Sequence, residues 1–286
     1  MSLLKIGNKD FELGKRTIVM GILNVTPDSF SDGGKFFSLE DAVKQAVRME
    51  KEGADIIDVG GESTRPGAKA ISLEEEMNRV APVVEELVKK VNIPISVDTY
   101  KSEIAEKALA LGAGMINDIT ALQGDKLLAS LVAEYDVPIC LMHMKGNPRN
   151  MQANPMYDDV MKEIHDFLKE RADYAMSCDI KRENIIIDPG LGFGKRTGKG
   201  IEDNCEILHR LSELKDLEFP ILVGPSRKTF IGNICGGKQP LLVTDRLEGS
   251  LAAACMAVAN GADIVRVHDV KETHRCIDMI DCVLGR

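Results

Sequence analysis

The stretch Gly53-Ala54-Asp55-Ile56-Ile57 returns twice further along the chain, as Gly112-Ala113-Gly114-Met115-Ile116 and as Gly261-Ala262-Asp263-Ile264-Val265. A second phrase alternates with it and consists of an apolar residue, a proline and an isoleucine: Ile93-Pro94-Ile95, Val137-Pro138-Ile139 and Phe219-Pro220-Ile221. Glycine readily adopts the left-handed conformation that ends a helix, and proline can follow a helix but cannot continue it. Each phrase therefore marks a point where a helix ends and a strand begins.

Apolar runs of strand length follow all these phrases, and two more runs occur at Ile18–Leu23 and Ile185–Ile187. Continuous apolar runs are typical of parallel strands that are buried on both faces. Amphipathic segments with helical periodicity lie between the runs: Leu39–Glu52, Leu73–Lys90, Ser102–Leu111, Lys126–Glu134, Tyr157–Met176, Asn204–Leu214, Thr244–Ala259 and Thr273–Val283.

Eight strands in strict alternation with eight helices predict an α/β protein with a single (β/α)8 TIM barrel. A doubly wound sheet is the less favoured alternative, because it usually has fewer strands and a single glycine-rich first turn. The segment Leu3–Leu13 contains the turn signal Gly7-Asn8, which predicts an N-terminal hairpin that closes the bottom of the barrel. No shift in composition marks a second domain, so residues 1–286 are expected to form one.

The composition limits the classes of function. The chain has 286 residues, 44% of them hydrophobic, and 36 Lys+Arg against 45 Asp+Glu give a net charge of -9. This charge argues against nucleic-acid and membrane partners, and the absence of tryptophan disfavours base stacking. Seven cysteines without a C-x-x-C pair indicate reduced thiols. Because no apolar run is long enough to span a membrane, we expect a soluble, cytoplasmic protein.

Polar residues follow the predicted strands where each strand ends. In a TIM barrel these carboxyl ends form the active site. The exits carry the following residues: Asn24, Gly60-Gly61-Glu62, Asp98, Asn117-Asp118, His143, Asp188, Ser226-Arg227-Lys228, and Arg266 with His268. A single Asp or Asn at a strand end often caps the next helix only, but polar residues at all eight exits together indicate a site.

The side chains at these exits fall into two chemical groups. Carboxylates, an amide and an ammonium suit the donor and acceptor edge of a flat heterocycle, with metal binding as the competing interpretation: Asp98, Asn117, Asp188 and Lys228. Cations and donors at the rim suit a phosphate or pyrophosphate group: Asn24, Arg65, Arg266 and His268.

A glycine-rich stretch, Gly190–Lys195, follows the sixth strand. Its spacing fits neither the Walker motif nor the dinucleotide fingerprint, so we interpret it as an active-site loop. No Ser-His-Asp set has a recognisable nucleophile elbow, and hydrolase chemistry therefore has no support.

Several longer motifs together resemble the dihydropteroate synthase family, in order and over nearly the whole chain. They are Met20–Gly34, Asp58–Gly67, Ser96–Thr99, Ile116–Ile119, Met142–Met144, Asp188–Gly190, Ser226–Lys228 and Arg266–Val270. The resemblance implies a pterin-binding TIM barrel over residues 1–286. It also implies a magnesium-dependent transferase that joins 6-hydroxymethyl-7,8-dihydropterin pyrophosphate to p-aminobenzoate, usually as a homodimer. Such an enzyme makes the dihydropteroate precursor of folate and is a target of sulfonamides.

The resemblance also implies roles for individual residues. It places the pterin on Asp98, Asn117, Asp188 and Lys228, with Arg266 stacked on the ring. It places the pyrophosphate on Asn24, Arg65, Arg266 and His268, and magnesium near Asn24 and Asp32. The residues expected to carry catalysis are Asp98, Asp188, Lys228, Arg266 and His268. No protein nucleophile is needed, because loss of pyrophosphate makes the pterin methylene electrophilic.

Six positions match those that enclose p-aminobenzoate in the family: Phe30, Thr64, Pro66, Gly192, Phe193 and Thr229. Thr229 stands where many relatives have serine and keeps the hydroxyl, which would meet the substrate carboxylate beside the helix N-terminus that follows. The stretch Arg196–Asp203 is longer and more basic than the usual loop of the family.

Two rival functions remain. A pterin-dependent methyltransferase of the same superfamily would share the Asp98, Asn117 and Asp188 positions, but it would not need Ser226-Arg227-Lys228. A non-catalytic pterin-binding barrel is the second rival, and the presence of Arg266 and His268 argues against it.

Overall fold

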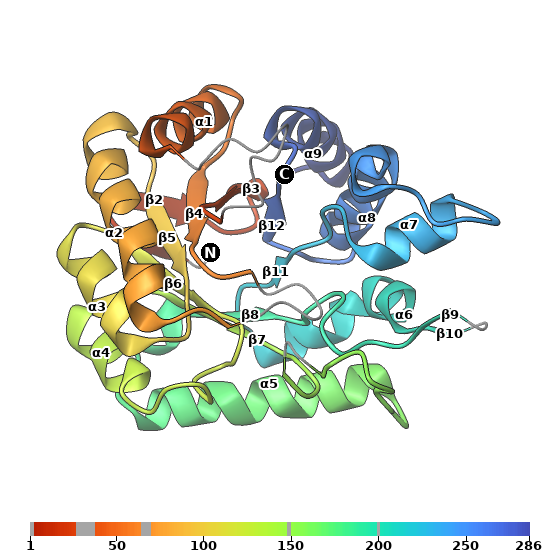
Figure 1. The fold of residues 1–286 in the computed structure, drawn as a ribbon. Coiled ribbons are helices and arrows are strands. Elements are labelled where there is room, and N and C mark those ends of the chain that lie inside the picture. The colour runs from red at the N-terminus through yellow and green to blue at the C-terminus, as the bar shows by residue number, and fades with distance from the viewer. Residues whose placement is uncertain (1–2, 27–37, 64–69, 148–149, 199–200) are drawn as a thin grey trace.

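The protein folds around a barrel of parallel strands (Figure 1). The computed structural model describes residues 3–26, 38–63, 70–147, 150–198 and 201–286. Eight strands form one sheet in the order β11-β12-β3-β4-β5-β6-β7-β8. Their bounds are β3 Ile18–Asn24, β4 Ile56–Gly60, β5 Ile95–Asp98, β6 Met115–Asp118, β7 Ile139–Met142, β8 Ile185–Asp188, β11 Leu222–Val223 and β12 Ile264–Val267.

A parallel bridge between Ile187 and Ile221 joins the two ends of this sheet, and the Ile187 amide donates to the Pro220 carbonyl at 3.0 Å. The predicted (β/α)8 barrel is therefore confirmed. Helices surround the strands (Figure 1): α1 Leu39–Lys51, α2 Leu73–Lys90, α3 Ser102–Ala110, α4 Leu128–Tyr135, α5 Val160–Ser177, α6 Asp203–His209, α7 Thr229–Cys235, α8 Leu247–Ala259 and α9 Val270–Leu284.

The helices end at the repeated glycine motifs of the sequence. Gly53, Gly112 and Gly261 have φ angles of +102°, +108° and +109°. At these positive φ angles the Cβ atom of any other residue would clash with the backbone, whereas glycine has no Cβ. Each glycine therefore lets the chain turn from a helix into the next strand. At the opposite ends, the Ser38 and Ser72 hydroxyls accept from backbone amides in the first turns of α1 and α2 and cap both helices.

The predicted hairpin is present as β1 (Leu3–Ile6) paired antiparallel with β2 (Lys9–Glu12). Leu4, Ile6 and Phe11 from this hairpin join a buried cluster inside the barrel, together with inward side chains of the strands such as Met20 and Met115. A second, larger cluster fills the space between the outer face of the strands and the helices. The hairpin therefore closes the amino end of the barrel with apolar side chains, and the carboxyl end is left for polar ones.

Some element boundaries differ from the sequence prediction. The segment predicted as a helix at Asn204–Leu214 is α6 followed by a 3-10 helix over Leu211–Leu217. Leu211, Leu214 and Leu217 are all buried, and their spacing of three matches the three residues per turn of a 3-10 helix. The helix predicted from Thr244 begins at Leu247, after a short 3-10 turn.

The short helix α7 begins at Thr229, where the resemblance implied a helix N-terminus, although the predicted amphipathic segments did not include it. A small hairpin of β9 (Thr197–Gly198) and β10 (Ile201–Glu202) within the stretch Arg196–Asp203 was not predicted. Arg196 binds Asp203 through its backbone amide at 2.6 Å and through its guanidinium at 2.9 Å. One basic residue of this stretch, Arg196, therefore forms an ion pair that joins the two ends of the hairpin.

Candidate active site at the carboxyl end of the barrel

The pleat of the strands places polar side chains directly above the apolar core of the barrel. Residues two positions apart on a strand face the same side. Four strands contribute an apolar residue to the interior cluster and a polar residue two positions later: Ile56 and Asp58, Met115 and Asn117, Ile186 and Asp188, Ile264 and Arg266. The polar residues therefore form the next layer towards the carboxyl end.

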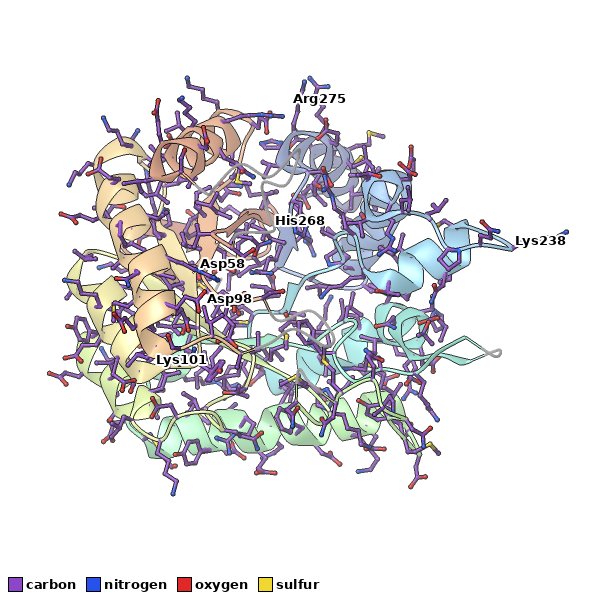
Figure 2. The ribbon with its side chains drawn as sticks, in the orientation of Figure 1. Asp58, Asp98, Lys101, Lys238, His268 and Arg275 are labelled. Carbon is purple, nitrogen blue, oxygen red and sulfur yellow. The ribbon has the colours of Figure 1, made fainter. Side chains whose placement is uncertain are left out.

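Arg266 lies at the centre of this layer. Its Nε donates to Asp58 Oδ2 at 2.5 Å, and one terminal nitrogen donates to Asp98 Oδ2 at 2.7 Å. Asn117 Nδ2 donates to the same Asp58 oxygen at 3.0 Å. The structure thus brings together the predicted residues Asp98, Asn117 and Arg266, and Figure 2 shows Asp58 and Asp98 side by side near the centre of the barrel.

Asp58 is a site residue that our sequence analysis missed. It is completely buried, and its Oδ1 has no hydrogen-bond partner within the described residues. Ser96, which pairs with Asp58 in register on the neighbouring strand, has an unpartnered hydroxyl by the same criterion. The sequence signal for Asp58 is a carboxylate inside an otherwise apolar strand, below the strand exit.

Asp188, Lys228 and Phe193 form the opposite side of the site. Asp188 Oδ1 accepts from the Gly190 amide at 2.7 Å, and the Lys228 ammonium lies 4.3 Å from the centre of the Phe193 ring. A Cβ atom on Gly192 would lie 3.3 Å from Lys228 Cδ. Gly192 and Phe193, both predicted to enclose p-aminobenzoate, therefore pack against Lys228. Thr229 is exposed at the start of α7.

Burial shifts the titration of these groups. It raises the pKa of Asp98 to about 7, opposed by Arg266, and that of Asp188 to about 6, opposed by the Gly190 amide and Lys228. Burial also lowers the pKa of Lys228 to about 8, opposed by Asp188. Burial alone would lower the pKa of Arg266, but Asp58 and Asp98 raise it instead. The four charged groups therefore affect one another, as expected of a single desolvated site.

The remaining predicted residues lie at the rim or outside the described chain. His268 Nδ1 lies 3.0 Å from Ser226 Oγ, which also accepts from the His268 amide. A Cβ on Gly60 would lie 3.6 Å from Asn24 Oδ1 and 3.7 Å from an Asp98 oxygen, so Asn24 borders the polar layer. The positions outside the described residues are Phe30, Asp32, Thr64, Arg65 and Pro66.

A second buried ionic cluster lies beside the site at the end of β5. Lys101 Nζ binds Glu62 Oε2 at 2.8 Å and Glu76 Oε2 at 2.5 Å, and the Thr99 hydroxyl donates to Glu76 at 2.8 Å. Glu76 is 1% exposed. The sequence pattern did not predict this cluster, because Glu76 occupies a helix position that acidic residues usually expose.

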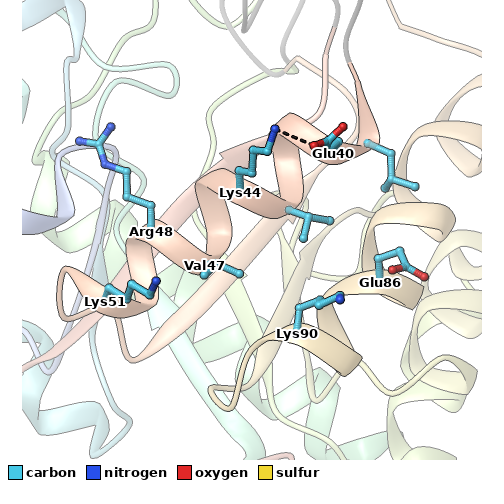
Figure 3. Close-up of a pocket in the computed structure, with 9 residues that line it drawn as sticks. Glu40, Lys44, Val47, Arg48, Lys51, Glu86 and Lys90 are labelled. Carbon is cyan, nitrogen blue, oxygen red and sulfur yellow. Dashed lines mark ion pairs between the residues drawn. The ribbon is translucent and has the colours of Figure 1, made fainter.

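A cleft of about 840 Å³ lies elsewhere, between α1 and α2 on the outside of the barrel (Figure 3). Leu39, Val43 and Val47 line it together with Lys44 and Glu86. It contains none of the residues at the strand ends, so we assign it no part in the site.

The glycine loop after β8 allows a sharp test of the site geometry. Gly190 has φ +69°, and a Cβ there would lie 1.9 Å from the His143 carbonyl oxygen. Gly190→Ala should therefore lower both the melting temperature and turnover. Gly198→Ala is the matched control, because Gly198 has φ +83° and a Cβ added there would have no atom of the described residues within 4 Å. Both variants carry a backbone strain of roughly 1 kcal/mol, so equal melting temperatures would contradict the close approach.

Comparisons with known proteins show the family of this chain. The family model for pterin binding enzymes matches residues 20–268. Dihydropteroate synthase of Synechocystis is 46% identical over 98% of this chain and 94% of its own, and that of Escherichia coli is 48% identical over 93% and 92%.

Solved structures of the same family share the fold of this chain. Dihydropteroate synthase of Yersinia pestis in complex with a sulfonamide drug has a TM-score of 0.92 at 42% identity, covering 99% of this chain and 100% of that one. The enzyme of Xanthomonas albilineans with 4-aminobenzoic acid has a TM-score of 0.91 at 44% identity, with full coverage of both chains. The chain therefore belongs to the pterin-binding enzymes and, among these, to the dihydropteroate synthase family.

None of the helices in the described part of the chain could cross a membrane.

Proposed function

We propose that this protein is a transferase of folate biosynthesis. It joins 6-hydroxymethyl-7,8-dihydropterin pyrophosphate to p-aminobenzoate and yields 7,8-dihydropteroate and pyrophosphate. The observation that carries the proposal is the polar layer of Asp58, Asp98, Asn117, Asp188 and Arg266 at the carboxyl end of the barrel. A buried set of acceptors around one guanidinium suits a flat heterocycle that has several N–H donors.

In this proposal Asp188 accepts from the amino and amide N–H groups of the pterin, while Asp98, Asn117 and Lys228 bind its other polar atoms. Arg266 lies over the ring. Its ion pairs with Asp58 and Asp98 fix the guanidinium without a ligand, so little side-chain entropy remains to be lost on binding.

The pyrophosphate end is assigned to Asn24, Arg65, Arg266 and His268. Magnesium is part of the proposal, with Asn24 and Asp32 as the residues that would hold it. Within the described residues, no three or more His, Cys, Asp or Glu side chains gather as a metal site. A set of one or two protein oxygens nevertheless suits Mg²⁺, which usually keeps several waters and binds substrate phosphates. When bound, it would neutralise charge on the departing pyrophosphate.

The aromatic amine is a weak nucleophile, so the site has to favour the electrophile. The bond between the pterin methylene and the pyrophosphate oxygen breaks, and that electron pair leaves with pyrophosphate beside Arg65, Arg266 and His268. The amine nitrogen then forms the new C–N bond and loses a proton. Asp98 and Asp188 hold the reduced ring, whose electron release supports the positive methylene. Phe30, Thr64, Pro66, Gly192, Phe193 and Thr229 enclose the p-aminobenzoate.

The test is incubation of the protein with dihydropterin pyrophosphate, p-aminobenzoate and Mg²⁺, with detection of dihydropteroate by mass spectrometry. A sulfonamide should compete with p-aminobenzoate in the same assay. Pterin binding without product would favour the non-catalytic barrel, and methyl transfer to a corrinoid protein would favour the methyltransferase.

The proposal also covers the oligomeric state and the cellular location of the protein. We propose a cytoplasmic homodimer in which residues 1–286 form one pterin-binding domain. All seven cysteines are free thiols, which suits a reducing compartment. Sedimentation equilibrium tests the dimer, and cell fractionation tests the location.

Pterin binding should depend on pH, because acceptor roles require ionised carboxylates. Burial raises the pKa of Asp188 to about 6 and that of Asp98 to about 7. The free site is thus protonated at low pH, and the affinity for hydroxymethyl-dihydropterin should rise from pH 5 to about pH 8, one unit above the higher of the two pKa values. Calorimetry at several pH values measures this, and Asp188→Asn should show a shallower slope. An affinity that falls over this range would contradict the assignment.

A further inference from the structure

The glycine loop after β8 contains a buried lysine that the proposed mechanism does not use. Lys195 is 1% exposed. Its Nζ lies 2.9 Å from the Gly190 carbonyl oxygen, 3.0 Å from the Phe193 carbonyl oxygen and 3.0 Å from His143 Nδ1. One amino group therefore binds two backbone carbonyls of the loop and His143, which follows β7.

The backbone of the loop explains why it needs such a partner. Gly190, Gly192 and Gly194 have φ angles of +69°, +80° and +61°. This series of left-handed turns directs the Gly190 and Phe193 carbonyls to one buried point, where Lys195 meets them. The Gly190 carbonyl also accepts from the Phe193 amide at 3.1 Å, so the Phe193 carbonyl is the one that has Lys195 as its donor in the described structure. Buried carbonyls that lack a donor are costly, so the position of Phe193 depends on Lys195.

Other side chains hold different parts of the loop. Gln152 donates to the Gly192 carbonyl at 2.7 Å, and Asn204 accepts from the Gly192 amide at 2.7 Å. The Tyr157 hydroxyl donates to the Gly194 carbonyl at 2.6 Å. Lys195 is the side chain that binds the Phe193 carbonyl in the described structure, and the Phe193 ring in turn lies against the Lys228 ammonium.

We propose that Lys195 is a positioning residue, which binds the Gly190 and Phe193 carbonyls together with His143 and thereby sets the Phe193 ring against Lys228. The inference rests on the proposed function, which assigns Phe193 to the p-aminobenzoate side of the site. Lys195 would then govern the binding of the acceptor amine and leave the pterin subsite largely unchanged, because Asp188 is held by the Gly190 amide.

These contacts can persist whether or not Lys195 is charged. Burial lowers its pKa to about 7, opposed by Asp188 and Asp203 and reinforced by Lys228 and Lys145, and burial keeps the pKa of His143 well below its usual value. An ammonium donates to all three partners. A neutral amine donates to the two carbonyls and accepts from the Nδ1–H tautomer of His143. The positioning role therefore rests on hydrogen bonding, not on charge alone.

The experiment compares steady-state kinetics of Lys195→Met with those of wild type, with both substrates varied. The KM for p-aminobenzoate should rise about tenfold, the value of one lost buried hydrogen bond, with a much smaller change in the KM for the pterin substrate. Lys181→Met is the matched control, because Lys181 is an exposed lysine that pairs with Asp136 on the outer surface. Equal rises in both KM values would overturn the inference.

A double-mutant cycle with Phe193→Leu tests the route of the effect. If Lys195 acts through Phe193, Lys195→Met should add little to the KM for p-aminobenzoate once Phe193 is replaced, and full additivity would overturn the inference. If Lys195→Met fails to fold, His143→Leu removes one of the three contacts and should raise the same KM by a smaller factor.

Two readouts separate this inference from the proposed function. Absence of dihydropteroate with the wild-type protein would refute the function, whereas a normal KM for p-aminobenzoate in folded Lys195→Met would refute only the inference. A crystal structure of Lys195→Met, or of His143→Leu, decides the placement directly. The Phe193 ring should leave Lys228, and an unmoved ring would overturn the inference even if the protein made no product.

Discussion

Asp188→Asn is expected to reduce turnover to almost nothing and to weaken binding of the pterin pyrophosphate by at least about tenfold, since each lost charged hydrogen bond is worth roughly 1.5 to 3 kcal/mol. Asp188 is 6% exposed, and its Oδ1 already accepts from the Gly190 amide. An asparagine cannot accept from that amide and from two pterin N–H groups, because its NH2 group would face a donor.

Calorimetry with the pterin substrate and turnover measured by mass spectrometry check this result. Asp136→Asn is a suitable control for the loss of one surface carboxylate, because Asp136 pairs with Lys181 outside the site. A folded Asp188→Asn protein that binds the pterin as well as wild type would exclude Asp188 from its recognition.

Arg266→Met should have the second large effect, on stability as well as on binding. Removal of the guanidinium leaves Asp58, which is completely buried, and Asp98, whose side chain is 10% exposed, without their cation. Loss of one partner from a buried ion pair typically costs about 3 to 5 kcal/mol. The free energy of unfolding should therefore fall by an amount of this order, and denaturant titration measures it.

The double variant Arg266→Met/Asp58→Asn provides the control, because it removes one of the two uncompensated charges. It should recover part of the lost stability, and a further loss of the same size would contradict the ion-pair explanation.

The Arg266→Met substitution should also affect the binding of two ligands to different degrees. Arg266→Met should weaken the pyrophosphate-bearing substrate more than the bare hydroxymethyl-dihydropterin, because the guanidinium charge acts on phosphate while its plane packs on the ring.

Local backbone rules predicted most of the fold. A glycine at a positive φ has few alternatives, so Gly53, Gly112 and Gly261 mark the helix ends reliably. The 3-10 helix at Leu211–Leu217 was predicted as part of an α-helix, because a leucine spacing of three fits both kinds of helix over a short distance. The hairpin at Thr197–Glu202 was missed because it depends on the Arg196–Asp203 pair rather than on strand periodicity.

The sequence predicted the site residues at the carboxyl ends of the strands, but not those that lie deeper in the barrel or in the loop after β8. Asp98, Asn117 and Arg266 come together because parallel strands end at one edge of the barrel. Asp58 lies within its strand and was overlooked. Lys195 could not be predicted, since a lysine beside glycines usually reaches solvent, and its burial arises only when the loop turns two carbonyls inward.

The hairpin at the amino end also has a kinetic consequence. Leu4, Ile6 and Phe11 fill that end of the barrel, so substrates and products share the opposite entrance. In the proposed site the pterin reaches down to fully buried Asp58, whereas Thr229, which the proposal assigns to the p-aminobenzoate, is exposed. A ligand at the shallow position stands in the path to the deep one. We therefore expect compulsory order, in which the pterin substrate enters first and a sulfonamide bound before it delays its entry.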